Sequence, residues 1–161
     1  MVRAARYRLP LVLAIIGGDP RRFRTFVDLY HRTLDDLGAP RLPVGIHSPG
    51  HVADTDAEAL DQLRDHWRAM RDRIGGERGW PPSRPGEFEA QVGPGGSLYV
   101  GSPETVAKKI AATVHALDAD RFDMKYSAGT LPHEAMLRSI ELYGTEVIPR
   151  VRELLARPAA A

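Results

Sequence analysis

The fold class of this chain follows from the stretch LPLVLAIIGGDP, residues 9–20. Residues 9–16 are apolar almost without interruption, which is typical of a strand that is buried on both faces of a parallel sheet. Gly17 and Gly18 then make a turn, and Asp19-Pro20 is suited to the cap and first position of a helix. Apolar residues follow at spacings of three and four and predict one buried helix face: Phe23, Phe26, Val27, Tyr30, Leu34 and Leu37. The stretch therefore predicts one strand–turn–helix unit.

A second unit of the same kind covers residues 42–74. Residues 42–47 are expected to form a strand, and the sequence Ser-Pro-Gly-His at residues 48–51 is expected to form a turn. Thr55 and Glu58 have the Thr-x-x-Glu spacing that caps the start of a helix. The helix that follows has its apolar residues on one side: Leu60, Leu63, Trp67, Met70 and Ile74.

The third unit begins with a short strand at residues 97–100. Ser102 and Pro103 are suited to the cap and first position of the next helix, whose apolar residues are Val106, Ile110, Val114 and Leu117. A strand is expected at residues 121–126. The last helix carries an apolar stripe made of Leu137, Ile140, Tyr143, Val147, Val151 and Leu154.

The alternation of strands and helices predicts an α/β fold with parallel strands and right-handed crossovers. Residues 1–156 are expected to form one domain, and residues 157–161 a frayed tail. Residues 75–96 are rich in glycine and proline, which predicts an irregular insertion loop that serves either as a binding loop or as a linker. Three major strands are too few to close a barrel, so two sheet edges and one sheet face are expected to lack partners.

Composition excludes several classes of function. The chain has 161 residues, of which 43% are hydrophobic and 27% charged, as in an ordinary globular domain. A net charge of +1 gives little attraction to nucleic acid or to a membrane surface, and no apolar run approaches the roughly 20 residues that cross a bilayer. Without cysteine there is no disulfide and no thiolate. We therefore expect a cytoplasmic protein that binds neither nucleic acid nor membranes.

Five segments follow one another in a characteristic order: LPLVLAIIGGDPRRF, DLY, VADTD, YVGSPETV and LPHE, at residues 9–23, 28–30, 52–56, 99–106 and 131–134. Together they resemble the C-terminal part of the bacterial-luciferase-like flavin-dependent monooxygenases, over nearly the whole chain. The complete chain of that family is a (β/α)8 TIM barrel. The resemblance therefore implies a partial TIM barrel of about three C-terminal βα units, without the early strands and the loop that holds most of the flavin phosphate.

Active sites of TIM barrels lie at the C-terminal ends of the strands, which selects the candidate residues. Ile16, Gly17 and Gly18 end the first predicted strand, where the glycines would let the backbone approach a flat ring and the isoleucine would pack on it. The alternative is a purely structural role, in which the glycines only make the turn before the helix. His47 and Ser48 end the second strand, and His47 is the candidate catalytic residue, because an imidazole can act as acid, base or hydrogen-bond donor beside a flavin. Otherwise His47 is a loop residue with a satisfied hydrogen bond.

Tyr126 and Gly129 lie at or just beyond the end of the strand expected at residues 121–126 and are the remaining candidates for cofactor binding. Tyr126 is equally suited to the core. His51 follows His47 by four residues, but a Pro-Gly turn between them and the lack of a matching carboxylate argue against a shared metal ion. No metal site is predicted.

The resemblance implies an oxidoreductase that uses reduced flavin and O2 to oxygenate a small organic substrate. The implied cofactor is FMN or, alternatively, a deazaflavin. A further alternative is that the isolated chain binds no cofactor. The implied partners are a flavin reductase or a complementing barrel half, in a homo- or hetero-oligomer that completes the site. The alternative is a non-catalytic binding or assembly protein derived from the same scaffold.

Overall fold

The computed structural model describes residues 1–156, and the expected frayed tail, residues 157–161, lies outside the described residues. The strands are β1 (Leu11–Ala14), β2 (Val44–Val52), β3 (Tyr99–Gly101) and β4 (Arg121–Lys125). The helices are α1 (Val2–Arg6), α2 (Arg24–Asp36), α3 (Asp56–Glu77), α4 (Glu87–Val92), α5 (Pro103–Leu117), α6 (His133–Leu142) and α7 (Ile148–Ala156). A 3-10 turn (Pro20–Phe23) precedes α2, and a π-helical turn (Tyr143–Val147) joins α6 to α7.

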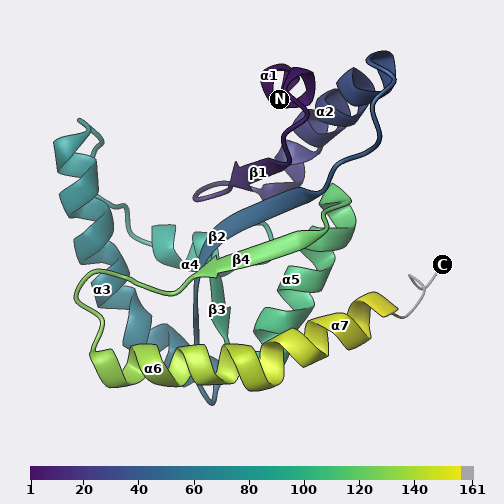
Figure 1. Cartoon of the computed structure of the whole chain (residues 1–161). Coiled ribbons are helices and arrows are strands. Elements are labelled where there is room, and N and C mark those ends of the chain that lie inside the picture. The colour runs from purple at the N-terminus through teal and green to yellow at the C-terminus, as the bar shows by residue number, and fades with distance from the viewer. Residues whose placement is uncertain (157–161) are drawn as a thin grey trace.

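The strands pair in parallel, as predicted, and β2 lies at the centre of the sheet (Figure 1). β1 pairs with the first half of β2, with Ala14 opposite His47. β4 pairs with β2 along residues 45–49, and β3 pairs with residues 50–52. Within residues 1–156, β1 and β4 therefore each have one neighbour and one unpaired edge.

The predicted turn at residues 48–51 is wrong, because β2 continues through it to Val52. Gly50 explains how a Pro-Gly sequence stays in the strand. A Cβ atom at Gly50 would lie 2.6 Å from the carbonyl oxygen of Tyr99 and 2.6 Å from the Sδ atom of Met124. Glycine at this position therefore allows β3 and β4 both to approach β2 closely, and the pairing with β3 keeps the backbone extended.

The first strand is shorter than the predicted residues 9–16. The N–H of Leu9 donates to the carbonyl oxygen of Ala4 at 3.0 Å, so the chain is still turning out of α1 at that point. Arg8 makes this turn with a φ of +52°, a left-handed conformation that favours glycine. The last strand is also one residue shorter than predicted and ends at Lys125.

Two of the three predicted helix caps form as expected. Asp19 accepts the N–H of Arg21 at 2.9 Å, and Thr55 accepts an N–H three residues further at 3.2 Å. Ser102 occupies the cap position of α5, but its side chain makes no capping bond. Its own N–H donates instead to Asp56 at 2.6 Å, which ties the start of α5 to the start of α3.

Helices cover one face of the sheet. The residues of β1 and β2 on that face are buried in one cluster with side chains of α2 and α5: Leu11, Leu13, Ile15, Val27, Tyr30, Leu34, Val44, Ile46 and Leu117. The hydroxyl of Tyr30 donates to the carbonyl oxygen of Leu9 at 2.7 Å, so its polar end is satisfied. Burial of each large apolar side chain contributes about 1.5–3 kcal/mol. This cluster is therefore a main source of stability for the sheet.

The expected irregular loop at residues 75–96 contains more regular structure than predicted, because α3 continues to Glu77 and α4 lies within it. Lys109 of α5 holds the end of this segment. Its Nζ donates to the carbonyl oxygens of Val92, Gly93 and Leu98 at 2.7, 2.8 and 3.0 Å. Burial lowers the pKa of Lys109 to about 8, but the three carbonyl oxygens favour the charged ammonium form.

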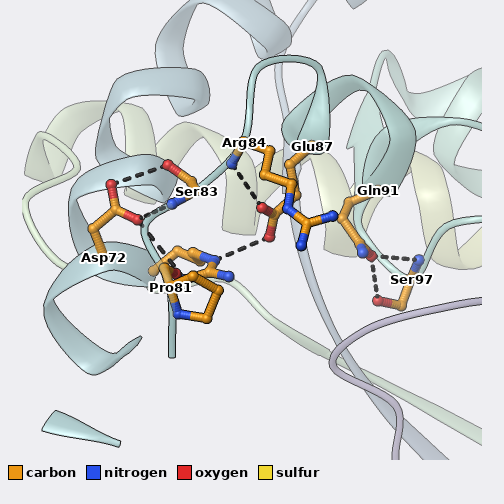
Figure 2. A network of polar contacts seen from close by, with 8 residues as sticks. Asp72, Pro81, Ser83, Arg84, Glu87, Gln91 and Ser97 are labelled. Atoms are coloured by element: carbon orange, nitrogen blue, oxygen red, sulfur yellow. Dashed lines mark hydrogen bonds and ion pairs between the residues drawn. The ribbon is translucent and has the colours of Figure 1, made fainter. Parts of the chain in front are cut away.

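Polar contacts tie the start of the same segment to α3 (Figure 2). Asp72 accepts the N–H and the hydroxyl of Ser83 at 2.6 and 3.0 Å. Glu87 accepts the N–H of Arg84 and the Nε–H of Arg71, both at 3.0 Å. The glycine and proline content of residues 75–96 predicted a loop. The contacts that order this segment join residues that are 11 and 16 positions apart, which is beyond the range of local sequence patterns.

Candidate functional site

The two faces of the sheet differ in what covers them. Successive side chains of a strand point to opposite faces. The face that carries Leu13, Ile46 and Phe122 packs against helices and is termed the packed face. The opposite face, termed the open face, carries the alternate residues Val12, Ala14, Gly45, His47, Arg121 and Asp123. In a closed barrel the face opposite the helices is the filled interior, but here Val12 is 58% exposed.

His47, the predicted catalytic residue, is half-buried on the open face. It lies in the middle of β2 rather than at its end, opposite Ala14 of β1 and Asp123 of β4. Asp123 accepts a hydrogen bond from Nε of Arg121 at 2.8 Å. The imidazole therefore stands next to a carboxylate–guanidinium pair, where it can donate or accept a hydrogen bond or move a proton.

The sequence analysis missed Asp123 and Arg121 as neighbours of His47. A signal was present, because Arg-Phe-Asp-Met-Lys at residues 121–125 alternates polar and apolar residues with the period of a strand that has one apolar face. That pattern does not show which residue of a neighbouring strand lies opposite each position. The register between β2 and β4 supplies this information.

Ile16, Gly17 and Gly18 lie just beyond β1, separated from Ala14 by Ile15. The N–H of Ile15 donates to the carbonyl oxygen of His47 at 2.9 Å, so the chain still runs beside β2 just before these residues. Ile16 is 60% exposed, and a Cβ atom on either glycine would meet no atom within 4 Å. The segment thus offers an apolar side chain and unobstructed backbone near His47. Its contact with a cofactor stays a prediction.

Two other polar residues of β2 are fully buried. Ser48, a predicted cofactor-binding residue, donates its hydroxyl to the carbonyl oxygen of Ile15 at 2.9 Å and so joins β2 to β1. His51 has Nε2 2.7 Å from the side-chain oxygen of Gln62, whose amide nitrogen donates to Glu58 at 2.8 Å. The Gln62 oxygen can only accept, so Nε2 of His51 carries the proton. Nδ1 is buried without a partner, and burial lowers the pKa of His51.

The remaining candidates, Tyr126 and Gly129, lie away from His47. Tyr126 helps to line a groove of about 610 Å³ between β4, α5, α6 and α7, together with Phe122 and Met124 of the packed face. Gly129 has a φ of +64°, and a Cβ atom there would lie 3.6 Å from the Cβ of Met70 in α3. The structure thus places Ile16, Gly17 and Gly18 just beyond Ile15, which contacts the backbone of His47. It turns Ser48 to the packed face and places Tyr126 in the groove and Gly129 beside α3. The roles of all these residues toward a cofactor stay predictions.

The open face combines small and apolar residues with one imidazole. Ala14 is small and exposed, and His47 lies opposite it on β2 as a hydrogen-bonding group. Gly45 is buried beside Val12, whose Cγ2 atom would lie 3.3 Å from a Cβ atom at Gly45. An apolar surface next to a hydrogen-bonding group suits a flat ring that has apolar faces and polar edges. Over residues 1–156, no three histidine or acidic side chains come together as metal ligands would. In the same range, every helix is too short or too polar to pass through a bilayer.

Solved structures with the same fold are larger proteins. A monooxygenase from Streptomyces bottropensis shares 18% identity with a TM-score of 0.69, and the match covers 92% of this chain and 44% of that one. The FMN-bound oxygenating constituent of 3,6-diketocamphane monooxygenase, a type II Baeyer–Villiger monooxygenase from Pseudomonas putida, shares 19% identity with a TM-score of 0.68 and coverage of 93% and 45%. A coenzyme F420 dependent tetrahydromethanopterin reductase from Methanopyrus kandleri shares 17% identity with a TM-score of 0.53 and coverage of 87% and 45%. The chain thus spans less than half the length of these relatives, and its sheet corresponds to part of their barrels.

A search of curated protein sequences finds no significant match. The comparison with protein-family models agrees with the structural comparisons. The sequence model of a protein family described as luciferase-like monooxygenase matches residues 1–121, which include β1, β2, β3 and the open-face residue His47. This match covers well over half of the 161 residues. The chain therefore belongs to the luciferase-like monooxygenase family.

Proposed function

We propose that this chain forms one wall of a flavin-dependent monooxygenase that uses reduced flavin and O2 on a small organic substrate. The observation that carries the proposal is the open face, where the half-buried His47 lies opposite the small, exposed Ala14. Family membership and the FMN in the complex of the Pseudomonas putida relative favour FMN as the cofactor. The dependence of the Methanopyrus kandleri reductase on coenzyme F420 keeps a deazaflavin as the second choice.

The residues of the open face have separate tasks in this proposal. A reduced flavin, when bound, supplies the electrons and the oxygen chemistry. His47 donates a hydrogen bond to a polar edge of the ring or moves a proton at Nδ1 or Nε2. Asp123, held by Arg121 at 2.8 Å, orients the imidazole from the neighbouring strand. Ile16 packs on the ring and helps to exclude water, and Gly17 lets the backbone come close.

The second part of the proposal is that another chain completes the cavity. The exposure of Val12 shows that residues 1–156 leave the open face without a full cover, whereas oxygen chemistry on a flavin requires that water be kept out. The relatives are more than twice as long, and the further part of their chains is available to close the barrel. A flavin reductase is the second expected partner, as the source of the reduced cofactor.

The test is a titration of the purified chain with FMN and, separately, with a deazaflavin, in the oxidised and the reduced form. We expect saturable binding, weakened at least about tenfold by His47→Ala, which is the effect of losing one good hydrogen bond to a bound ligand. His115→Ala is the matched control, because His115 is exposed on α5, which covers the packed face. Equal affinity of both variants would contradict the role of His47.

The need for a completing chain has its own test. Addition of a protein that carries the remaining βα units of a relative should tighten flavin binding and start oxygen consumption that depends on reductant and flavin. No gain on mixing would contradict this part of the proposal. Failure to bind either flavin, alone or in the native assembly, would overturn the enzymatic proposal and favour a non-catalytic binding or assembly protein on the same scaffold.

A further inference from the structure

The outer edge of β1 presents free backbone groups. The N–H groups of Leu11 and Ile15 donate to β2 at 3.3 and 2.9 Å, so the odd-numbered residues of β1 face their neighbour in the sheet. Along a strand the backbone groups alternate in direction, and the N–H and C=O of Val12 and Ala14 therefore point away from β2. No strand within residues 1–156 pairs with this edge. Free edges of this kind readily add another strand.

The outer edge of β4 is protected, whereas the edge of β1 is not. The N–H of Asp120 donates to Val44 of β2, so it is the odd-numbered residues of β4 that face outward: Arg121, Asp123 and Lys125. Charged side chains are a common defence of free edges. The corresponding positions of β1 carry only Val12 and Ala14, followed by Ile16.

The surroundings of the β1 edge are apolar as well. Val12 and Ile16 are 58% and 60% exposed, and Tyr7 and Leu9, directly before the strand, are 72% and 55% exposed. Large exposed apolar side chains that gather at one place mark sites of association. A self-complementary surface needs no second kind of protein, because two copies related by a two-fold axis can cover it reciprocally.

We propose that β1 pairs antiparallel with β1 of a second copy of this chain. The pairing is centred on Ala14, which lies opposite Ala14 of the second copy, and Val12 lies opposite Ile16 of the second copy. The residues whose N–H and C=O point outward then form the ladder. The small Ala14 lets the two strands approach, and the two Val12–Ile16 pairs join β-branched side chains across the interface. Pro10 has no N–H to donate, but this register does not use it.

The two-fold axis of such a pair is perpendicular to the sheet, so both open faces lie on the same side of one continuous sheet. The two His47 side chains thus belong to one shared surface. The inference stands on the strand edge and does not rest on flavin binding. A complementing barrel half would compete for the same edge, and a test with this chain alone separates the two occupants.

The sharpest test is a single cysteine at the two-fold axis, since the natural sequence has none. Cα atoms of a hydrogen-bonded antiparallel pair are about 5.5 Å apart, a distance that a disulfide can bridge. Under mild oxidation Ala14→Cys should form a covalent dimer in most of the protein. Asp123→Cys, at the protected edge of β4, is the matched control and should stay monomeric. Failure of Ala14→Cys to cross-link, or equal cross-linking of both variants, would overturn the proposal.

Mass in solution, measured by light scattering across a dilution series, provides the second readout. The natural chain should be a dimer at micromolar concentration. Val12→Lys should weaken dimerisation about 100-fold or more, because the substitution occurs twice in a symmetric dimer. Leu137→Lys, which changes an equally exposed side chain on α6, should leave the dimer intact. A monomeric natural chain would overturn the proposal and leave the β1 edge to a different protein.

Discussion

The packed face and the open face consist of alternate residues of the same strands, but their surroundings are opposite. Leu13 and Ile46 are buried among helices, whereas their sequence neighbours Val12 and His47 are exposed and half-buried. A strand that is apolar on both faces is typical of a sheet with both faces covered. β1 is such a strand, and residues 1–156 cover only one of its faces. The fold is therefore stabilised from one side, while the other side is suited to a further layer.

Two truncations, one on each face of the sheet, compare the stability that the two faces contribute. The larger loss of stability is expected on the packed face. Ile46→Ala should lower the free energy of unfolding by about 3 kcal/mol, because it leaves a cavity in the packed cluster. Val12→Ala should lower it by less than about 0.5 kcal/mol in dilute protein, where no second copy covers the side chain. Urea denaturation of both variants at low concentration measures the difference. Similar losses would contradict the division of the sheet into two faces.

Fully buried His51 makes the stability of the fold depend on pH. Burial lowers the pKa of His51 below its ordinary value of 6.5, so the unfolded chain takes up a proton more readily than the folded chain as the pH falls. The contribution of neutral His51 to stability is complete above about pH 6.5 and is lost as the pH decreases toward the folded pKa. We expect lower stability at about pH 5.5 than at about pH 7.5.

The control for this pH effect lies four residues away on the same strand. His51→Gln should reduce the loss of stability between the two pH values, whereas His47→Gln, on the open face, should retain it because His51 is still present. Thermal unfolding of the three proteins in matched buffers gives the answer. An undiminished loss in His51→Gln would show that another group is responsible.

The parts of the fold that follow from local signals could be predicted from the sequence. The apolar run at β1, the cap at Asp19 and the apolar stripe of α2 lie within one stretch of chain, and together they indicated a parallel α/β unit. The passage of β2 through Pro49 and Gly50 could not be predicted in this way. It depends on β3 and β4, which approach Gly50 from segments about 50 and 75 residues further along the chain.

The residues of the candidate site also differ in whether local sequence or the pairing of strands determines their place. His47 was selected because it ended the expected strand at residues 42–47, where active sites of TIM barrels lie, and because an imidazole is a chemically useful group. The structure places it in the middle of the longer β2, and its catalytic role stays a prediction. Ser48 looked equally suitable, but the alternation of side chains turns it toward the packed face, where it bonds to Ile15. Asp123 was missed because its place opposite His47 is a matter of register between strands. Residue type could be evaluated from the sequence, whereas facing direction and register required the structure.

A much smaller change in stability tests whether the open face is solvated in the single chain. Asp123→Ala removes an ion pair with Arg121, and an exposed pair of this kind contributes less than about 0.5 kcal/mol. Glu87→Ala removes a comparable pair with Arg71 at 3.0 Å, but that carboxylate is more enclosed and also accepts an N–H, so the loss of stability should be larger. Urea denaturation of dilute protein compares the two variants. If Asp123→Ala costs as much as Glu87→Ala even at high dilution, the open face is covered in the single chain, and neither a completing chain nor a second copy is required to explain its sequence.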